Sequence, residues 1–197
     1  MKIHFSPASP YVRKCVAVAM HHGLTLERVT TNPHESPAHL LADNPLSKVP
    51  SLVTDDGLTL NDSPVITEYL DHLGTGSKLY PEAGPERWQA LAVAALADGI
   101  LDAAVGRRLQ SQLPQDEGRQ KYDARQKAAV TRALDALEAT DLTGPLDIGK
   151  LGVVCALGYL DFRFGHEDWR AAHPKLRAFY AAQMVNPVFA ETAPPPA

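Results

Sequence analysis

Alternation of polar and apolar residues at the start of the chain predicts a β-strand followed by a helix. Lys2 to Phe5 alternates as a short strand does, and apolar residues then recur at helical spacing from Val12 to Met20. Leu26 to Thr31 predicts a second strand. We expect a βαβ unit, in which the two strands are parallel and the crossover is right-handed.

The next segment predicts a short helix, a hairpin and a longer helix. The short helix is expected at residues 36–42, and the sequence DDG at 55–57 joins two β-type runs, 51–54 and 58–60. A helix with apolar residues on one face then begins at 62–64 and ends at Gly74. The element order β-α-β-α-β-β-α predicts an α/β domain.

After this helix the strand pattern stops, and the second half of the chain reads as helical throughout. Residues 78–84 resemble a linker, so we expect an α/β domain at residues 1–77 and an all-helical domain at residues 85–197. The apolar periodicity predicts four helices, at residues 88–112, 123–139, 147–164 and 174–184. The third of these is apolar almost all round and is expected to be central, whereas the proline-rich tail from Thr192 is expected to be disordered.

Composition and charge exclude several classes of partner. The chain of 197 residues carries 19 Lys and Arg against 23 Asp and Glu, a formal net charge of -4, and its longest basic run is Arg107-Arg108, so no nucleic acid is expected. The longest apolar run, residues 151–160, is half the length of about 20 residues that a membrane span needs, so no membrane is expected. Cys15 and Cys155 lie far apart in apolar helical patterns, which indicates buried, reduced thiols and a cytoplasmic protein.

Three Ser-Pro pairs open predicted helices, beginning at Ser9, Ser36 and Ser63. Capping alone explains this placement, because serine is a preferred N-cap and proline suits the first helical turn. Ser9 follows the first strand and Ser63 follows the hairpin. Because ligands of open α/β sheets bind beyond strand ends, these two helix starts are also candidate anion sites.

Taken together, several segments resemble the glutathione S-transferase superfamily, and in particular its bacterial YibF-like branch. The resemblance covers nearly the whole chain and is carried by SPASPYVRK at 6–14, NPLSKVPSLV at 44–53, LNDSPVITEYL at 60–70, LADGILDA at 96–103 and GYLDFR at 158–163. It implies a thioredoxin-like N-terminal domain that binds glutathione as co-substrate. It also implies a C-terminal helical bundle that shapes a pocket for a small hydrophobic electrophile, and a homodimeric enzyme of detoxification.

The resemblance also assigns roles to individual residues. Ser9 lies where the family has its catalytic Ser, Cys or Tyr, and Val49 precedes Pro50, which is expected to be cis, with its backbone pairing with the cysteinyl part of glutathione. Asp62 and Ser63 match the pair that receives the γ-glutamyl amine and carboxylate. Lys48 is either a ligand of the glycyl carboxylate or a solvated lysine, and no metal is expected, because the eight histidines show no ligand spacing that indicates a metal site.

These residue types suit thiolate chemistry. A thiol with a pKa of about 8.5 is mostly protonated at neutral pH, and lowering that pKa by two units needs about 2.7 kcal/mol. A hydroxyl that donates to a thiolate supplies about 1.5 to 3 kcal/mol, so Ser9 is expected to be a hydrogen-bond donor and not a nucleophile. Ser6 is the alternative donor. Conjugation and reduction of peroxides or disulfides both remain open, as does a non-catalytic binding or regulatory module of the same fold.

Some positions have more than one interpretation. Asp98 and Asp102 share a helix face, where they form an exposed stripe or pair with Arg107 or Arg163, unless Asp98 meets the γ-glutamyl ammonium. Serine at position 9 excludes the mixed-disulfide chemistry of family members with cysteine there. Asp147 is expected to cap the third C-terminal helix alone, and we expect the aromatic residues Tyr11, Trp88 and Phe162 to lie in the core.

Overall fold

The computed structural model describes residues 1–194, which form two compact units. One unit comprises Met1 to Tyr80 together with the segment that begins at Glu191, and the other comprises Pro81 to Ala190. The first unit contains all the strands and the second contains helices only. A thioredoxin-like α/β unit and a helical bundle are therefore both present, as the sequence predicted.

The first unit is built on a four-stranded mixed sheet in the order β2-β1-β3-β4. Strand β1 is parallel to β2, as predicted for the βαβ unit, and antiparallel to β3, which in turn is antiparallel to β4. The strands are β1 (Lys2–Phe5), β2 (Glu27–Thr30), β3 (Leu52–Val53) and β4 (Thr59–Leu60). The hairpin strands are shorter than expected, because only two residues of each take part in the ladder.

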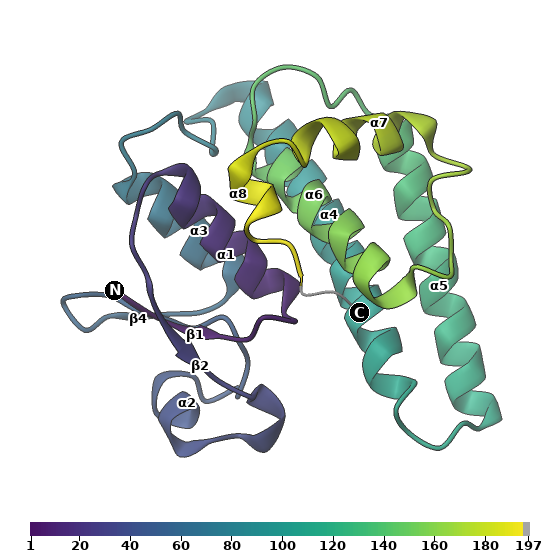
Figure 1. Ribbon diagram of the computed structural model, residues 1–197, viewed down its shortest axis with the longest axis horizontal. Coiled ribbons are helices and arrows are strands. Elements are labelled where there is room, and N and C mark those ends of the chain that lie inside the picture. The colour runs from purple at the N-terminus through teal and green to yellow at the C-terminus, as the bar shows by residue number, and fades with distance from the viewer. Residues whose placement is uncertain (195–197) are drawn as a thin grey trace. The chain divides into compact units, whose positions relative to one another are not determined.

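Helices cover both faces of this sheet. Figure 1 shows α1 and α3 on one side and α2 on the other. The helices are α1 (Pro10–His21), the short 3₁₀ helix η1 (Pro33–Glu35), α2 (Ala38–Asp43) and α3 (Ser63–Leu73). The α1 residues Val12 and Val16 pack with Leu40 of α2 and with Val49, so the loop before β3 is held against the first half of α1.

Of the three Ser-Pro pairs, only the first has its serine as N-cap. Ser9 caps α1, whereas Ser36 has a left-handed backbone with φ 46° and ends η1. Pro37 precedes α2, and Asp62 is the N-cap position of α3, which makes Ser63 the first helical residue. The capping predictions for Ser36 and Ser63 were therefore wrong. Ser36 ends the 3₁₀ helix at Pro33–Glu35, so Pro37 takes the N-cap position of α2. Asp62 takes the N-cap position of α3, one residue before Ser63.

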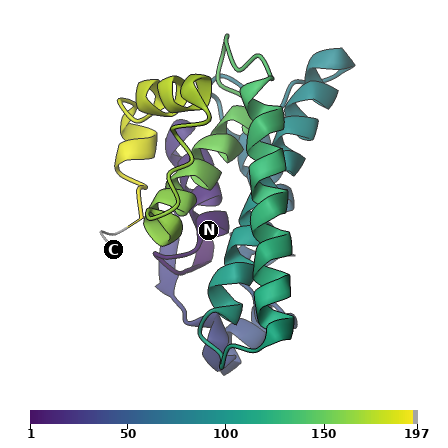
Figure 2. The ribbon, with the colours of Figure 1, turned by 90° about the vertical axis from the view of Figure 1, so that its right-hand side faces the viewer.

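The second unit is a bundle of helices in which α4 packs against both α5 and α6. Its elements are α4 (Gly84–Gln110), α5 (Glu117–Glu138), α6 (Ile148–Phe164), α7 (Pro174–Gln183) and α8 (Pro187–Ala190). Helices α4 and α5 run side by side in both views (Figures 1 and 2). Helix α5 begins six residues before the predicted position 123, because Asp116 accepts a hydrogen bond from the Arg119 amide and caps it.

Helix α6 is buried along most of its length, as predicted. Asp147 caps it by accepting from the Lys150 amide at 2.9 Å, which confirms that this aspartate begins the helix alone. A Cβ at Gly149 would lie 2.6 Å from the Ala90 carbonyl oxygen, so glycine permits the close approach of α6 to α4. Cys155 in α6 and Cys15 in α1 are both buried, and within the described residues neither forms a disulfide, as predicted.

Helix α4 exposes an apolar face. Trp88 is 69% exposed, so its assignment to the core was wrong, and Ala92, Ala95 and Gly99 continue the same exposed face. Within residues 1–194, α4 is the one helix long and apolar enough to cross a membrane by length and composition, with a third of that stretch buried. The apolar periodicity of α4 runs nearly all round the helix, and for that reason it did not separate the buried face from the exposed one.

The predicted linker is fixed at its beginning. The Asp71 carboxylate accepts hydrogen bonds from the backbone amides of Leu79 and Tyr80, at 2.7 Å and 3.3 Å. It also lies 2.8 Å from the Nε2 atom of the buried His22 ring. Lys78 donates to the carbonyl oxygens of Asp71 and Gly74 at 2.6 Å. Residues 78–80 therefore belong to the α/β unit and are anchored to the end of α3.

Candidate functional site

Ser9 lies where β1 ends and α1 begins. Its Oγ accepts a hydrogen bond from the Val12 amide at 3.3 Å, and Pro10 occupies the first helical position. A hydroxyl has one hydrogen to donate and two lone pairs, so this cap leaves the hydrogen available to an outside acceptor. The helix dipole favours an anion at the same place.

A small hollow of about 80 Å³ borders Ser9. Ser6 lines it as well, and the Ser6 carbonyl oxygen accepts from the Ser9 amide at 3.0 Å. Glu191, Thr192 and Ala193 form part of its wall, so this part of the tail lies against the α/β unit, while Pro195 and Pro196 of the predicted disordered tail lie outside the described residues. None of Lys48, Val49, Pro50, Asp62 and Ser63 lines the hollow.

The loop before β3 presents an open peptide edge. The Val49–Pro50 bond is cis, which confirms that expectation. Asn44, only 2% exposed, holds the loop: its side chain donates to the Lys48 carbonyl oxygen at 2.9 Å and accepts from the Leu46 amide at 3.0 Å. Among residues 1–194, neither the amide nor the carbonyl of Val49 has a hydrogen-bond partner, although this residue is buried against Val12. A peptide group that has no partner within the folded chain indicates a place where another chain can pair.

The start of α3 lies beside α1. The Cys15 thiol is 4.0 Å from the Ser63 carbonyl oxygen, which also accepts from the Thr67 hydroxyl at 2.8 Å. Asp62 is exposed and its carboxylate makes no capping hydrogen bond. Ser63 is 2% exposed, but its hydroxyl oxygen is not one of the buried side-chain atoms that lack a hydrogen-bond partner in the described part of the chain. These two side chains and the free amides of the first turn can therefore receive an amine and a carboxylate.

Of the predicted site residues, Ser9, Val49 and Ser63 are linked through contacts with α1, whereas Lys48 is not. Val49 packs on Val12, whose amide Ser9 caps, and Ser63 contacts Cys15 one turn further along α1. Lys48, by contrast, is exposed, and no ion pair fixes it within the described ranges. The structure supplies no contact that favours its ligand role over that of a solvated lysine.

The buried histidines have structural partners. Each of three, His4, His22 and His173, contacts a carboxylate, namely Asp43, Asp71 and Asp135 at 2.7, 2.8 and 3.0 Å. The hydrogen bond from His4 lowers the pKa of Asp43 below its ordinary value. In the described residues no three His, Cys, Asp or Glu side chains are grouped as metal ligands would be.

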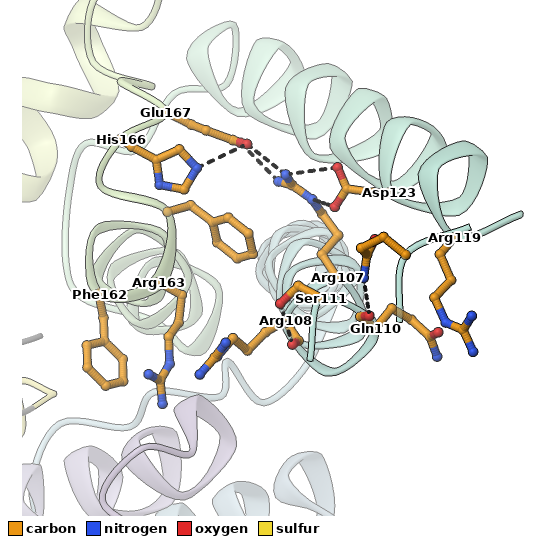
Figure 3. A pocket seen from close by; sticks show the side chains of 12 residues that line it. Arg107, Arg108, Gln110, Ser111, Arg119, Asp123, Phe162, Arg163, His166 and Glu167 are labelled. Atoms are coloured by element: carbon orange, nitrogen blue, oxygen red, sulfur yellow. Dashed lines mark hydrogen bonds and ion pairs between the residues drawn. The ribbon is translucent and has the colours of Figure 1, made fainter. Parts of the chain in front are cut away.

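A larger cavity, which the sequence did not reveal, lies within the helical unit (Figure 3). It has a volume of about 500 Å³ and lies between the end of α4, the start of α5 and the end of α6. Arginine is the most frequent lining residue: Arg107, Arg108, Arg119 and Arg163 all border it. The feature of the sequence that could have indicated this cavity is the pair Arg107-Arg108, the longest basic run in the chain.

Arg107 holds three segments together at one side of this cavity. It donates to Asp123 at 2.8 Å and to the two Glu167 oxygens at 2.7 and 3.0 Å, and its guanidinium lies 4.3 Å from the centre of the Phe164 ring. The hydrogen bonds from Arg107 to Glu167, together with one from Lys127, lower the pKa of Glu167 from 4.5 to about 2. Both acidic partners of Arg107 lie outside α4, so these contacts do not favour the alternative in which Asp98 or Asp102 pairs with Arg107.

Comparison with known proteins agrees with this architecture. The family model "Glutathione S-transferase, N-terminal domain" matches residues 8–73, and "Glutathione S-transferase, C-terminal domain" matches residues 103–182. The uncharacterized GST-like protein YibF of Escherichia coli (strain K12) is 32% identical over 202 residues, which cover 100% of each chain.

Solved structures agree in the same way. A glutathione transferase family member from Pseudomonas fluorescens Pf-5, with bound glutathione, has a TM-score of 0.92 and 40% identity and covers 98% of both chains. A structure of a family member from the same organism with bound S-(propanoic acid)-glutathione has a TM-score of 0.87 and 38% identity, covering 99% of this chain and 100% of that one. From the two matching family models, the full-length relative and these structures, we conclude that this protein belongs to the glutathione S-transferase superfamily, in a branch with YibF.

Proposed function

We propose that this protein is a glutathione transferase in which the α/β unit binds glutathione and the Ser9 hydroxyl donates a hydrogen bond to its thiolate. The observation that carries the proposal is the open peptide edge of Val49, packed on the residue whose amide Ser9 caps. A peptide ligand can form two backbone hydrogen bonds there, and the bound glutathione of the Pseudomonas relative supports this ligand.

Each remaining site residue receives one part of the tripeptide in this proposal. The Asp62 carboxylate takes the γ-glutamyl ammonium, and the Ser63 hydroxyl with the first amides of α3 takes the γ-glutamyl carboxylate. Lys48 meets the glycyl carboxylate. A hollow of 80 Å³ is well below the roughly 300 to 1,000 Å³ of small-molecule pockets, so only the sulfur end enters it and the rest of glutathione lies on the open surface.

Ser9 acts by stabilising charge. Its hydrogen bond and the start of α1 together favour the thiolate by roughly 2 to 4 kcal/mol, enough to bring a thiol pKa of about 8.5 to near 6 or 7. The sulfur then attacks an electrophilic carbon, the new S–C bond forms, and the leaving group departs with its bonding electron pair. In the S-(propanoic acid)-glutathione bound by the Pseudomonas protein, the sulfur carries a second S–C bond, to the propanoic acid group, which favours conjugation over reduction of peroxides or disulfides.

The proposal extends to assembly and location. The exposed face of α4 formed by Trp88, Ala92, Ala95 and Gly99 is apolar and rich in small residues, which suits close packing against a second copy in a homodimer. Two buried cysteines that form no disulfide in the described residues suit the reducing cytoplasm. The physiological role that follows from these properties is detoxification of electrophiles.

Calorimetric titration of the full-length protein with glutathione tests the proposal. We expect saturable binding at millimolar concentration or below, and turnover of at least one class in a screen of haloarenes, hydroperoxides and mixed disulfides. Failure to bind both glutathione and glutathione disulfide would contradict it and favour a binding or regulatory module of the same fold.

A further inference from the structure

Positive charge is concentrated around the 500 Å³ cavity of the helical unit, although the whole chain has a net charge of -4. Four arginines line the cavity against two carboxylates, Asp123 and Glu167. Arg119 is paired with Asp116 at 2.5 Å and also donates to the Pro114 carbonyl oxygen. Arg107 forms ion pairs with both of these carboxylates, so neither of them compensates the charge of Arg108 or Arg163.

Arg108 and Arg163 come from two different helices and extend to the same side of the cavity. Figure 3 shows their guanidinium groups pointing away from the cluster of Arg107, Asp123 and Glu167. Burial raises the pKa of the Tyr159 hydroxyl, and both guanidiniums act in the opposite direction, Arg163 through charge and a hydrogen bond and Arg108 through charge. The geometric observation is that both arginines line the same cavity.

Neither arginine has an acidic partner in the part of the chain that the structure describes. The Nε of Arg163 is buried and has no hydrogen-bond acceptor there, although its guanidinium lies 3.8 Å from the centre of the Phe162 ring. The ring holds the guanidinium plane in place. Because the Arg163 guanidinium is held in place and one of its N–H groups has no acceptor, it can donate a hydrogen bond to a bound ligand.

Helix polarity explains part of this arrangement. Arg108 and Arg163 lie in the last turns of α4 and α6, where carbonyl groups favour cations by about 0.3 to 1 kcal/mol each. This effect accounts for the sign of the charges. It does not account for two guanidiniums on the same side of one cavity, because like charges repel.

We propose that Arg108 and Arg163 bind the carboxylate of a small organic acid, and that the electrophile this transferase conjugates to glutathione is such an acid. The second clause rests on the proposed function. The two planar guanidinium groups match the in-plane oxygens of a carboxylate, and the Phe162 ring, which also lines the cavity, offers an apolar surface to an aromatic body. The expected electrophile is thus an acid with an apolar frame and not a neutral hydrophobe.

The first test measures binding without chemistry. The probe 4-methylbenzoate is titrated into the full-length protein by calorimetry, and R108Q and R163Q are each expected to weaken it by about tenfold or more, since hydrogen bonds to charged groups contribute about 1.5 to 3 kcal/mol. R163K retains the positive charge but loses the planar guanidinium that donates two parallel hydrogen bonds, so we expect its affinity for the probe to lie between those of wild type and R163Q. R125Q, which removes an exposed arginine of α5, is the matched control and leaves binding unchanged. Equal affinity for inorganic phosphate would contradict a carboxylate site.

The second test measures selectivity in turnover. In the reaction of glutathione with 4-(bromomethyl)benzoate, the thiol proton passes to solvent, the thiolate attacks the benzylic carbon, and bromide leaves with the C–Br electron pair. The methyl ester of the same acid is the neutral comparator. We expect the ratio of kcat/KM for acid over ester to fall by about tenfold or more in R108Q and in R163Q. Because the ratio is taken within each variant, general damage to the fold cancels.

The outcomes separate this inference from the proposed function. Absence of turnover with both bromides and across the electrophile screen would remove the transferase proposal and with it the substrate assignment, while arginine-dependent binding of 4-methylbenzoate would retain the anion site. Turnover with a ratio that neither variant changes would overturn the substrate inference and leave the transferase intact. A rise in the KM for glutathione with an unchanged ratio would overturn it as well, because the arginines would then bind glutathione.

Discussion

Ser9 combines a structural and a proposed chemical role in one hydroxyl, and Ser9→Ala separates them. Loss of the cap on the Val12 amide is expected to lower the free energy of unfolding by about 1 kcal/mol. Loss of the donated hydrogen bond is expected to raise the apparent pKa of the bound thiol by about one to two units and to lower the rate at neutral pH. Chemical denaturation measures the first effect, and a pH–rate profile with glutathione measures the second.

Ser6→Ala is the matched control for this experiment. Ser6 lines the same hollow but offers its carbonyl, not its hydroxyl, to the Ser9 amide. We expect an unchanged profile in Ser6→Ala. A shifted profile in that variant, with a normal one in Ser9→Ala, would transfer the donor role to Ser6.

Asp62 is proposed to bind the ammonium group of glutathione, and Asp62→Asn tests that contact without changing the shape of the side chain. The carboxylate is exposed and caps nothing, so we expect stability to stay within about 0.5 kcal/mol. Glutathione affinity is expected to fall by about tenfold or more, because a charge-assisted hydrogen bond is lost. Calorimetry measures it, with Glu27→Gln, which removes an exposed carboxylate of the same unit, as control. Wild-type affinity in Asp62→Asn would remove this residue from the site.

Sequence reasoning at the level of residues worked where the signal was local. The Ser9 cap depends on two adjacent residues, and the cis bond at Pro50 came from a short motif recognised by resemblance. The contacts of Arg107 with Asp123 and Glu167 span 16 and 60 positions and combine three elements. Such a pairing depends on how helices pack, which neither composition nor periodicity contains.

Among the elements, the end of α4, the start of α5 and the turn after α6 depend on the Arg107 cluster, and this dependence gives the stability a pH dependence. The folded pKa of Glu167 lies at about 2, below its ordinary 4.5, so its contribution is fully present above the unfolded pKa and is lost as the pH falls. We expect Glu167→Gln to lower the free energy of unfolding at pH 7 by up to about 3 kcal/mol. The difference from wild type is expected to shrink between about pH 5 and pH 2. Denaturant titrations across this range measure it.

Glu117→Gln serves as the control for this prediction. Glu117 pairs with Lys121 one turn away on α5, but both side chains are at least 75% exposed, so its removal is expected to change little at any pH. A Glu167→Gln variant whose stability tracks wild type at every pH would show that the cluster does not stabilise the helical unit.

The helices and strands themselves were largely predictable, and their errors have physical causes. The period of Val12, Cys15 and Val16 located α1 correctly, because one face of that helix is apolar and the cap is local. The start of α5 was placed too late because its first turns are polar and exposed, so periodicity carries no signal there and only the Asp116 cap marks the beginning. The long helix α4 shows the opposite failure, since too many of its positions are apolar.

At the scale of the whole molecule, that excess of apolar positions on α4 has a use if a second copy covers the exposed face. Trp88, Ala92, Ala95 and Gly99 recur at three and four residues, so they form one continuous stripe, and an added Cβ at Gly99 would meet nothing within 4 Å in the monomer. Ala95→Arg places a charge in the middle of this stripe. Since a two-fold axis introduces the charge twice, we expect the dimer to weaken by about a hundredfold or more.

Sedimentation velocity across a concentration series measures this dissociation, and Ala136→Arg on the exposed surface of α5 is the control for added charge. Alanine and arginine have similar helix propensity, so monomer stability is expected to stay nearly constant in both variants. A wild-type protein that remains monomeric at every concentration would contradict the dimer. A dimer unaffected by Ala95→Arg would place the interface elsewhere and leave the exposed Trp88 without an explanation at this scale.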